Sequence, residues 1–209
     1  MKKAIITLSL ISILATSCIS TKSIKLPTET VFNKQSASGL VVGTISFNYH
    51  RKKAPFDNYL FQLSYDSNDK ELVKLNSTNI SLNVNFFNGR FNGELNDKKT
   101  FPFAIELNEG TYNFDGFKFW WNGGYVTSEL RNPVKFSLPI EVQKGVIHYI
   151  GNITINLRQV DKSFIEITDE MAKYEPFFKA KYSSIDWNLL NNKTIKTGDD
   201  GFGFIKLNK

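Results

Sequence analysis

Hydrophobic and polar residues alternate along most of the chain after Gly39. In residues 39–49, Val41, Ile45 and Phe47 fall on one side of an extended chain, and polar residues fill most of the other side. A period of two residues is typical of a β-strand with one buried face. The same alternation recurs in seven further stretches, which we predict to be strands: residues 59–65, 80–86, 101–107, 111–121, 134–142, 146–157 and 164–167.

Turn-forming residues separate these stretches. Asn and Gly cluster between the predicted strands, for example at 88–89, 108–110 and 122–124. Short strands that recur at intervals of about 10 to 20 residues with such turns are typical of antiparallel sandwiches and barrels. Aromatic residues make up 14% of the chain, with 18 Phe and 8 Tyr, and these side chains favour strands. The predicted fold is therefore mainly β, an antiparallel β-sandwich.

One helix is predicted near the C-terminus, over residues 169–182. It has acidic residues in its first turn and lysines in its last, as the helix dipole prefers. Pro176 lies inside it and predicts a kink or a restart near Glu175. An apolar stripe should pack this helix on the sandwich: Met171, Tyr174, Phe178 and Tyr182. Residues 201–207 predict a last strand at a sheet edge.

The first 17 residues have the pattern of a secretory signal peptide. Lys2 and Lys3 precede an apolar run over residues 4–14, and small residues follow it at 15–17. The run is too short for a transmembrane helix, which needs about 20 apolar residues. Removal of this segment takes away two lysines and no acidic residue, so the formal charge falls from +6 to about +4.

Cys18 is the single cysteine of the chain, and it follows the signal directly. This placement resembles a bacterial lipobox, in which the cysteine receives diacylglycerol, the peptide is cut before it, and the new amino group is acylated with a fatty acid such as palmitate. Two or three acyl chains hold a protein on a membrane firmly. The alternative is a secreted protein with an unpaired N-terminal cysteine, but an odd cysteine is a liability in an oxidising compartment. We therefore expect Cys18 to be the lipid attachment point.

The residues after Cys18 suggest a place in the bacterial cell envelope. Ile19 is not the Asp that resembles an inner-membrane retention signal, so we expect the outer membrane. No acidic residue follows in 19–25, which favours a periplasm-facing position over the cell surface. Residues 18–38 are rich in Ser, Thr and Lys and predict a flexible tether. Residues 39–209 are then expected to form a single β-sandwich domain.

Two motifs resemble those of uncharacterised bacterial envelope lipoproteins. The first is a Leu-x-x-Gly-x-Tyr turn at Leu107, Gly110 and Tyr112. The second is a strand pair with the pattern Phe136, Leu138, Ile140, Val142, Gly145, Tyr149, Ile150 and Gly151. The resemblance spans residues 39–185. It implies an extracytoplasmic sandwich of immunoglobulin-like or prealbumin-like type, and it transfers no catalytic residue, because the shared positions are turn and core residues.

Residues that could carry chemistry are few. His50 and His148 have no metal-ligand neighbours at the spacing of a zinc site, and no nucleophile, phosphate-binding or metalloprotease motif occurs. The acidic pair Asp199 and Asp200 precedes Gly201 and is best explained as a turn. We therefore expect no enzyme, no cofactor and no metal. The modest charge and the short basic run at 51–53 also argue against nucleic-acid binding.

The most promising binding feature is the stretch 120–125, with Trp120, Trp121, Asn122 and Tyr125. Neighbouring strand residues point to opposite faces, so the two tryptophans cannot enter the same core. An exposed aromatic beside Asn and Gly can stack on a sugar ring or anchor a protein partner. The alternative is that one tryptophan fills the core and the other caps the sheet edge.

These observations lead to a predicted function. The chain should be a lipid-anchored envelope lipoprotein that acts as a non-catalytic binding or scaffolding module, with an envelope protein or a glycan as partner. A carbohydrate-binding lipoprotein that uses residues 120–125 is the alternative. An enzyme is the least favoured hypothesis, because no constellation of nucleophile, base or metal ligands is visible.

Overall fold

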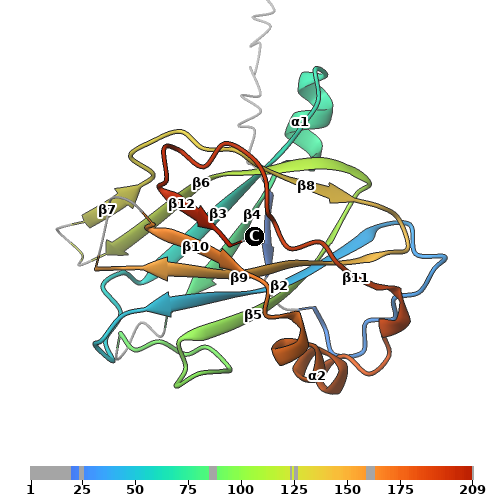
Figure 1. The fold of residues 1–209 in the computed structure, drawn as a ribbon, viewed down its shortest axis with the longest axis horizontal. Coiled ribbons are helices and arrows are strands. Elements are labelled where there is room, and N and C mark those ends of the chain that lie inside the picture. The colour runs from blue at the N-terminus through green and yellow to red at the C-terminus, as the bar shows by residue number, and fades with distance from the viewer. Residues whose placement is uncertain are drawn as a thin grey trace, which may run out of the picture.

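The computed structural model describes residues 20–23, 26–84, 89–122, 124, 127–158 and 163–208. The fold is mainly β, as the alternation predicts, with antiparallel and mixed sheets (Figure 1). Cys18 and Tyr125 lie outside the described residues.

One sheet contains the longest strand, β6, which pairs with β3, β7 and β8. Its order is β1-β4-β3-β6-β7, and β8 also pairs with β6. The strands are β1 (Ser20–Ser23), β3 (Asn58–Tyr65), β4 (Thr78–Asn83), β6 (Gly110–Asn122), β7 (Thr127–Arg131) and β8 (Leu138–Val142). The pairs are antiparallel except for β1 with β4.

The other sheet has the order β12-β10-β9-β2-β5, and β11 also pairs with β9. Its strands are β2 (Gly39–Asn48), β5 (Thr100–Leu107), β9 (Ile147–Asn156), β10 (Ile165–Thr168), β11 (Leu190–Asn192) and β12 (Ile205–Leu207). The last strand pairs with β10 at the sheet edge.

The prediction of antiparallel pairing throughout is wrong. The central pair of the second sheet, β2 and β9, is parallel from Leu40 opposite Ile147 to Asn48 opposite Asn156. The pairs β10–β12 and β11–β9 are parallel as well. Alternation shows that a strand has two faces but carries no information on its direction, and long connections allow either direction.

The main core lies between the two sheets and is rich in aromatic rings. Tyr59 and Phe61 on β3, Phe119 on β6 and Phe47 on β2 are all buried in it. The rings of Phe47 and Tyr59 are 4.5 Å apart at their centroids, and those of Tyr59 and Phe119 are 4.9 Å apart. Such aromatic pairs stabilise a core beyond the area that they bury.

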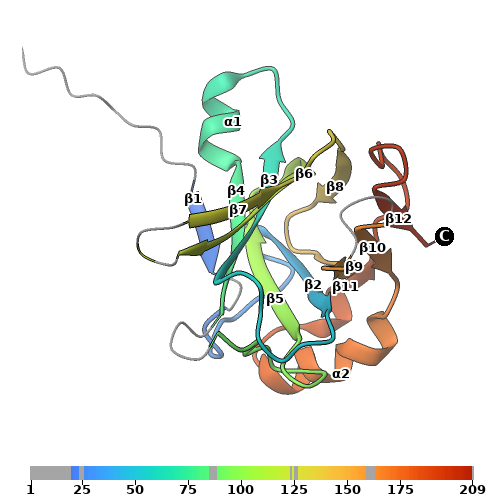
Figure 2. The same cartoon turned by 90° about the vertical axis from the view of Figure 1, so that its left-hand side faces the viewer.

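The second sheet is also buried on its other face. Leu40 and Val42 of β2 point away from the main core and pack with Tyr149 and helix α2 (Met171–Lys181). This differs from the prediction that strand 39–49 buries one face, because its second face also carries two large aliphatic residues near its start. Helix α2 covers that face at one end of the molecule, while α1 (Lys70–Asn76) lies at the other end (Figure 2).

Helix α2 agrees with the predicted apolar stripe. Tyr174, Phe178 and Tyr182 are buried, and Met171 packs against the same cluster. The helix runs through Pro176 as one element, so the predicted restart near Glu175 does not occur. Pro176 lies on the exposed side, where water can bind the carbonyl that its ring leaves without a donor.

Part of the predicted tether packs on the fold. Phe32 is 1% exposed and forms a bridge with Ile185, and its carbonyl accepts a hydrogen bond from Asp186 N at 2.9 Å. Residues 20–23 form β1 beside β4. The described part of the predicted tether is therefore not free of the fold, because Phe32 and Leu26 pack on it and residues 20–23 pair with β4.

Helix α1 was not predicted from the alternation. Asp69 caps it, because its carboxylate accepts hydrogen bonds from the backbone N–H groups of Glu71 and Leu72. None of its residues is buried. Its signal in the sequence is a capping Asp before a short run of mixed apolar and polar residues.

Candidate functional site

The two tryptophans of the predicted binding stretch lie at the end of β6, and neither fills the core. Phe119 points into the core, and Trp121 lies on the same side of the strand, beyond the core, with 40% of its surface exposed. Trp120 points to the opposite face and is half-buried. The alternative in which one of them is a core tryptophan therefore does not apply.

Trp120 lies among charged side chains on the outer face of the first sheet. The Lys118 ammonium is 5.6 Å from the centre of its ring and 2.8 Å from the Glu129 carboxylate. Arg131 also pairs with Glu129. Side-chain hydrogen bonds lower the pKa of Glu129, and the bond from Arg131 has a larger effect than the bond from Lys118. The Lys118–Glu129 pair crosses from β6 to β7, whereas Arg131 and Glu129 both lie on β7.

Trp121 borders a hollow of about 300 Å³, which is the lower limit for small-molecule sites. Its other walls come from the loop after β2: Tyr49, Arg51, Lys53, Ala54, Pro55 and Asp57. One carboxylate oxygen of Asp57 accepts a hydrogen bond from Asn122 N at 3.0 Å, which ties the loop to the end of β6. The hollow thus combines an aromatic face, two cationic side chains and a carboxylate.

Asn122 has a structural task beside this hollow. Its side-chain oxygen accepts a hydrogen bond from Gly124 N at 3.0 Å, which closes the turn after β6. Sequence reasoning placed Trp121 and Asn122 near the site but missed Arg51, Lys53 and Asp57. The basic run at 51–53 was visible, but the fold alone places Arg51 and Lys53 around the same hollow as Trp121.

A second polar site lies where α2 meets the second sheet. Asn152 is 3% exposed, and its side-chain oxygen accepts hydrogen bonds from Thr44 Oγ1 and Ser46 Oγ, both at 2.8 Å. Its amide nitrogen donates to Glu170 Oε1 at 3.3 Å. Ser46, Asn152 and Glu170 border a hollow of about 290 Å³ that Lys99 and Lys173 also line. The polar groups bond to one another, so this network joins the helix to the sheet.

The remaining sequence candidates have structural explanations. His148 is buried, and its Nε2 accepts a hydrogen bond from Gln143 N at 3.0 Å. Burial lowers the pKa of its imidazole. Asp199 and Asp200 accept hydrogen bonds from the backbone N–H groups of Gly201 and Gly203 and form a turn.

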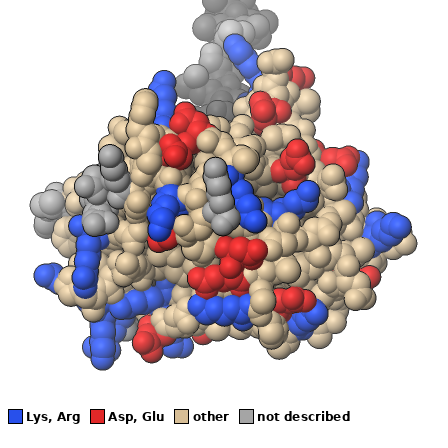
Figure 3. Space-filling model, in the orientation of Figure 1, with Lys and Arg blue, Asp and Glu red and all other residues tan. Residues whose placement is uncertain are grey.

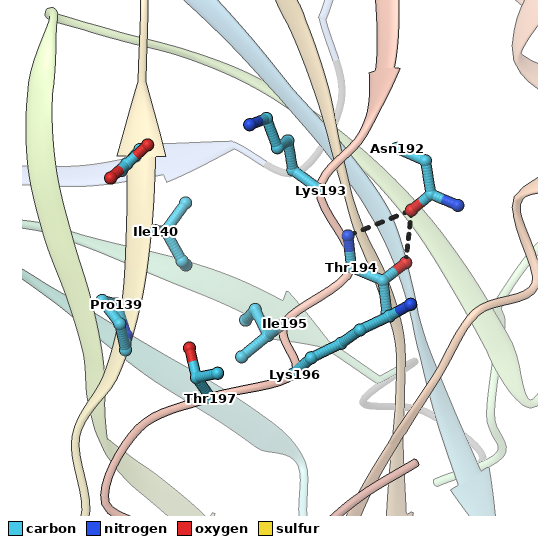
Figure 4. Close-up of a pocket in the computed structure, with 9 residues that line it drawn as sticks. Pro139, Ile140, Asn192, Lys193, Thr194, Ile195, Lys196 and Thr197 are labelled. Atoms are coloured by element: carbon cyan, nitrogen blue, oxygen red, sulfur yellow. Dashed lines mark hydrogen bonds between the residues drawn. The ribbon is translucent and has the colours of Figure 1, made fainter. Parts of the chain in front are cut away.

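A groove of about 440 Å³ separates the edge of β8 from residues 192–197 (Figure 4). Ile140 and Ile195 form its apolar floor from opposite sides. Asn192 accepts hydrogen bonds from Thr194 N and Thr194 Oγ1 and shapes one wall. The groove lies between β8 of the first sheet and the segment after β11 of the second, and its lining also includes Glu141, Lys193 and Lys196.

Charged side chains of both signs are interspersed over the face shown in Figure 3. Within the described residues, no group of three or more His, Cys, Asp or Glu side chains could hold a metal ion. No helix in that same part of the chain is long and apolar enough to cross a membrane.

Comparisons with known proteins leave the family open. No protein-family model and no curated protein matches the chain. Among solved structures, a leucine-rich repeat protein from Bacteroides thetaiotaomicron is similar over 81% of this chain and 20% of its own length, with 17% identity and a TM-score of 0.33. The chain thus spans about a fifth of that protein.

Proposed function

We propose that this chain is a lipid-anchored module of a bacterial envelope and that it binds its partner without catalysis at the hollow beside Trp121. The observation that carries the proposal is the exposed indole at the edge of that hollow, opposite Arg51 and Lys53. A large aromatic side chain that the core could have buried, but that lines a recess instead, is typical of binding sites.

Lipid attachment at Cys18 is supported by the signal peptide pattern and by the position of the cysteine. The outer membrane, with the module in the periplasm, remains the proposed location. The two packed sheets are also compatible with an immunoglobulin-like or prealbumin-like sandwich, and the parallel pair β2–β9 is the feature that such an assignment must accommodate.

The anchor is tested by changing Cys18 to Ala in the natural host. The wild type should sediment with membranes and enter the detergent phase, while the variant should stay in the soluble fraction. Equal membrane association of both proteins would reject lipidation at Cys18.

Carbohydrate binding is a specific form of this function. Indole rings stack on the apolar faces of sugars, and the carboxylate and cations around Trp121 can bond to hydroxyl or acidic substituents. The wild-type chain should therefore give signal on a glycan array, and Trp121→Ala should reduce affinity roughly tenfold or more, as loss of a central aromatic contact does.

The matched control is Phe202→Ala. Phe202 is 93% exposed on the turn before β12, so its removal tests whether any exposed ring has the same effect. Binding should be unchanged in this variant. If the array is blank but crosslinking through position 121 captures an envelope protein, the partner is a protein and the carbohydrate form is rejected.

A further inference from the structure

The chain enters the fold beside helix α1. Strand β1 runs parallel to β4, with Ser20 opposite Thr78, and Thr78 is two residues after the last residue of α1. Paired strands lie about 4.8 Å apart. Two peptide units separate Cys18 from Ser20, so their Cα atoms are at most about 8 Å apart on any path. The proposed lipid attachment point therefore cannot be far from α1.

Helix α1 exposes two leucines. Leu72 is 43% exposed and Leu75 is 73% exposed, and a spacing of three residues places them on neighbouring parts of the helix surface. Val73 and Asn76 are half-buried and turn toward the body of the protein. Only five large hydrophobic side chains are exposed among the described residues, and two of them lie on this seven-residue helix.

We infer that α1 contacts the surface of the lipid bilayer that holds the anchor and that Leu72 and Leu75 enter its interfacial region. The inference rests on the lipid attachment proposed above. A single exposed leucine needs no explanation. Leu72 and Leu75 lie beside the proposed attachment point, so the apolar part of the bilayer is close to both. No residue of α1 is buried in the protein core.

The contact depends on the anchor for its strength. Two leucines alone bind a bilayer weakly. When the chain is already attached nearby, their insertion becomes an intramolecular step with a high effective concentration, so a weak contact is populated. The short helix also gains order, because a helix of seven residues is marginal in water without a packing partner.

Charge contributes little to this contact. Lys70 and Lys74 are balanced by Asp69 and Glu71, so the helix has no net attraction for anionic headgroups. The long lysine stems can extend toward the aqueous side while the leucines enter the interface. Neutral and anionic bilayers should therefore be contacted to a similar degree. Helix α2, at the other end of the molecule, should stay in water (Figures 1 and 2).

A fluorescent probe tests the contact. The only cysteine carries the lipid, so Lys74→Cys supplies a single free thiol for a polarity-sensitive dye while both leucines are kept. The lipidated full chain is placed on phosphatidylcholine vesicles, and flotation measures its attachment. The dye at position 74 should shift to the blue and be quenched by spin-labelled lipid. The matched control is Ala180→Cys on α2, where neither change should occur.

The outcomes separate the two proposals. Adding Leu72→Asn and Leu75→Asn should abolish most of the quenching at position 74 while flotation stays complete. If the protein floats but the dye at 74 is as water-exposed as the dye at 180, the bilayer contact is rejected and the anchor stands. If the full-length wild type purified from its host does not float, the anchor is rejected and the contact falls with it. Vesicles with anionic lipid should give the same quenching within about twofold, and quenching confined to them would overturn the apolar mechanism.

Discussion

Asn152 illustrates what single residues do in this protein. Its strand was predicted from alternation, but its partners Thr44 and Ser46 lie 108 and 106 residues earlier in the chain. The polar positions of that strand would be solvent-exposed in a simple two-layer sandwich. Here α2 covers the same face, so the side chains that remain under it must bond to one another.

Asn152→Ala should lower the free energy of unfolding by about 2–3 kcal/mol, because the hydroxyls of Thr44 and Ser46 lose a buried acceptor. Urea denaturation followed by fluorescence measures the change. Asn188→Ala is the control, since Asn188 is exposed and bonds locally to Asp186, and its effect should stay within about 0.5 kcal/mol. Equal effects of the two variants would contradict the structural role of Asn152.

His148 should make stability depend on pH. Burial lowers the pKa of its imidazole, and its Nε2 accepts a hydrogen bond, which requires the neutral form. The unfolded chain takes up a proton near pH 6.5, whereas the folded chain does so at lower pH. Its contribution is therefore complete above about pH 6.5 and is lost as pH falls.

The denaturation midpoint of the wild type should decrease as the pH is lowered from about 7.5 to about 5. The decrease should be smaller in His148→Gln, which keeps an acceptor for Gln143 N. His50→Gln is the comparison variant: desolvation and the nearby Arg158 lower the pKa of His50 as well, but its side chain is exposed, so its contribution should be the smaller one. If the pH dependence of stability persists in His148→Gln but disappears in His50→Gln, then His50 and not His148 causes it.

At the scale of elements, helix α2 turns the second sheet into a layer buried on both faces. The stripe of Tyr174, Phe178 and Tyr182 was predictable from helical spacing, because it depends only on local periodicity. The surface that it covers, formed by β2 and β9, was not predictable, since the two strands are far apart in sequence and pair in parallel.

Phe178→Ala should lower the free energy of unfolding by about 3–5 kcal/mol, the usual cost of removing a fully buried aromatic side chain. Its neighbour Phe177 is half-buried and supplies a matched control of the same residue type. Phe177→Ala should cost clearly less in the same thermal or urea experiment. A larger loss at position 177 would mean that the helix presents another face to the sheet.

In the whole molecule, segments far apart in the sequence pack together. Phe32, from the stretch predicted as a tether, packs beside Ile185, and Asp186 N donates to the Phe32 carbonyl. The candidate site is also assembled from distant segments, since Trp121 meets Arg51 and Lys53 across 70 and 68 residues. The prediction of an exposed tryptophan could be made from the sequence, but the identity of its neighbours could not.

Phe32→Ala should destabilise the protein by about 3–5 kcal/mol, because it empties a buried site between the N-terminal segment and the rest of the fold. Val31 is 68% exposed, so Val31→Ala should have almost no effect. Differential scanning calorimetry of both variants measures this contrast. If both variants unfold at the same temperature as the wild type, the N-terminal segment around Phe32 does not stabilise the fold and acts as a tether.

The mainly β character, the positions of most strands and the apolar stripe of α2 were predictable from the sequence, because each depends on the spacing of hydrophobic residues a few positions apart. The parallel pairing of β2 with β9, the burial of Phe32 and the residues around Trp121 became known from the three-dimensional fold alone. These features arise from contacts between residues far apart in the chain. The stability of these contacts depends on which surfaces pack together, and local periodicity does not specify that packing.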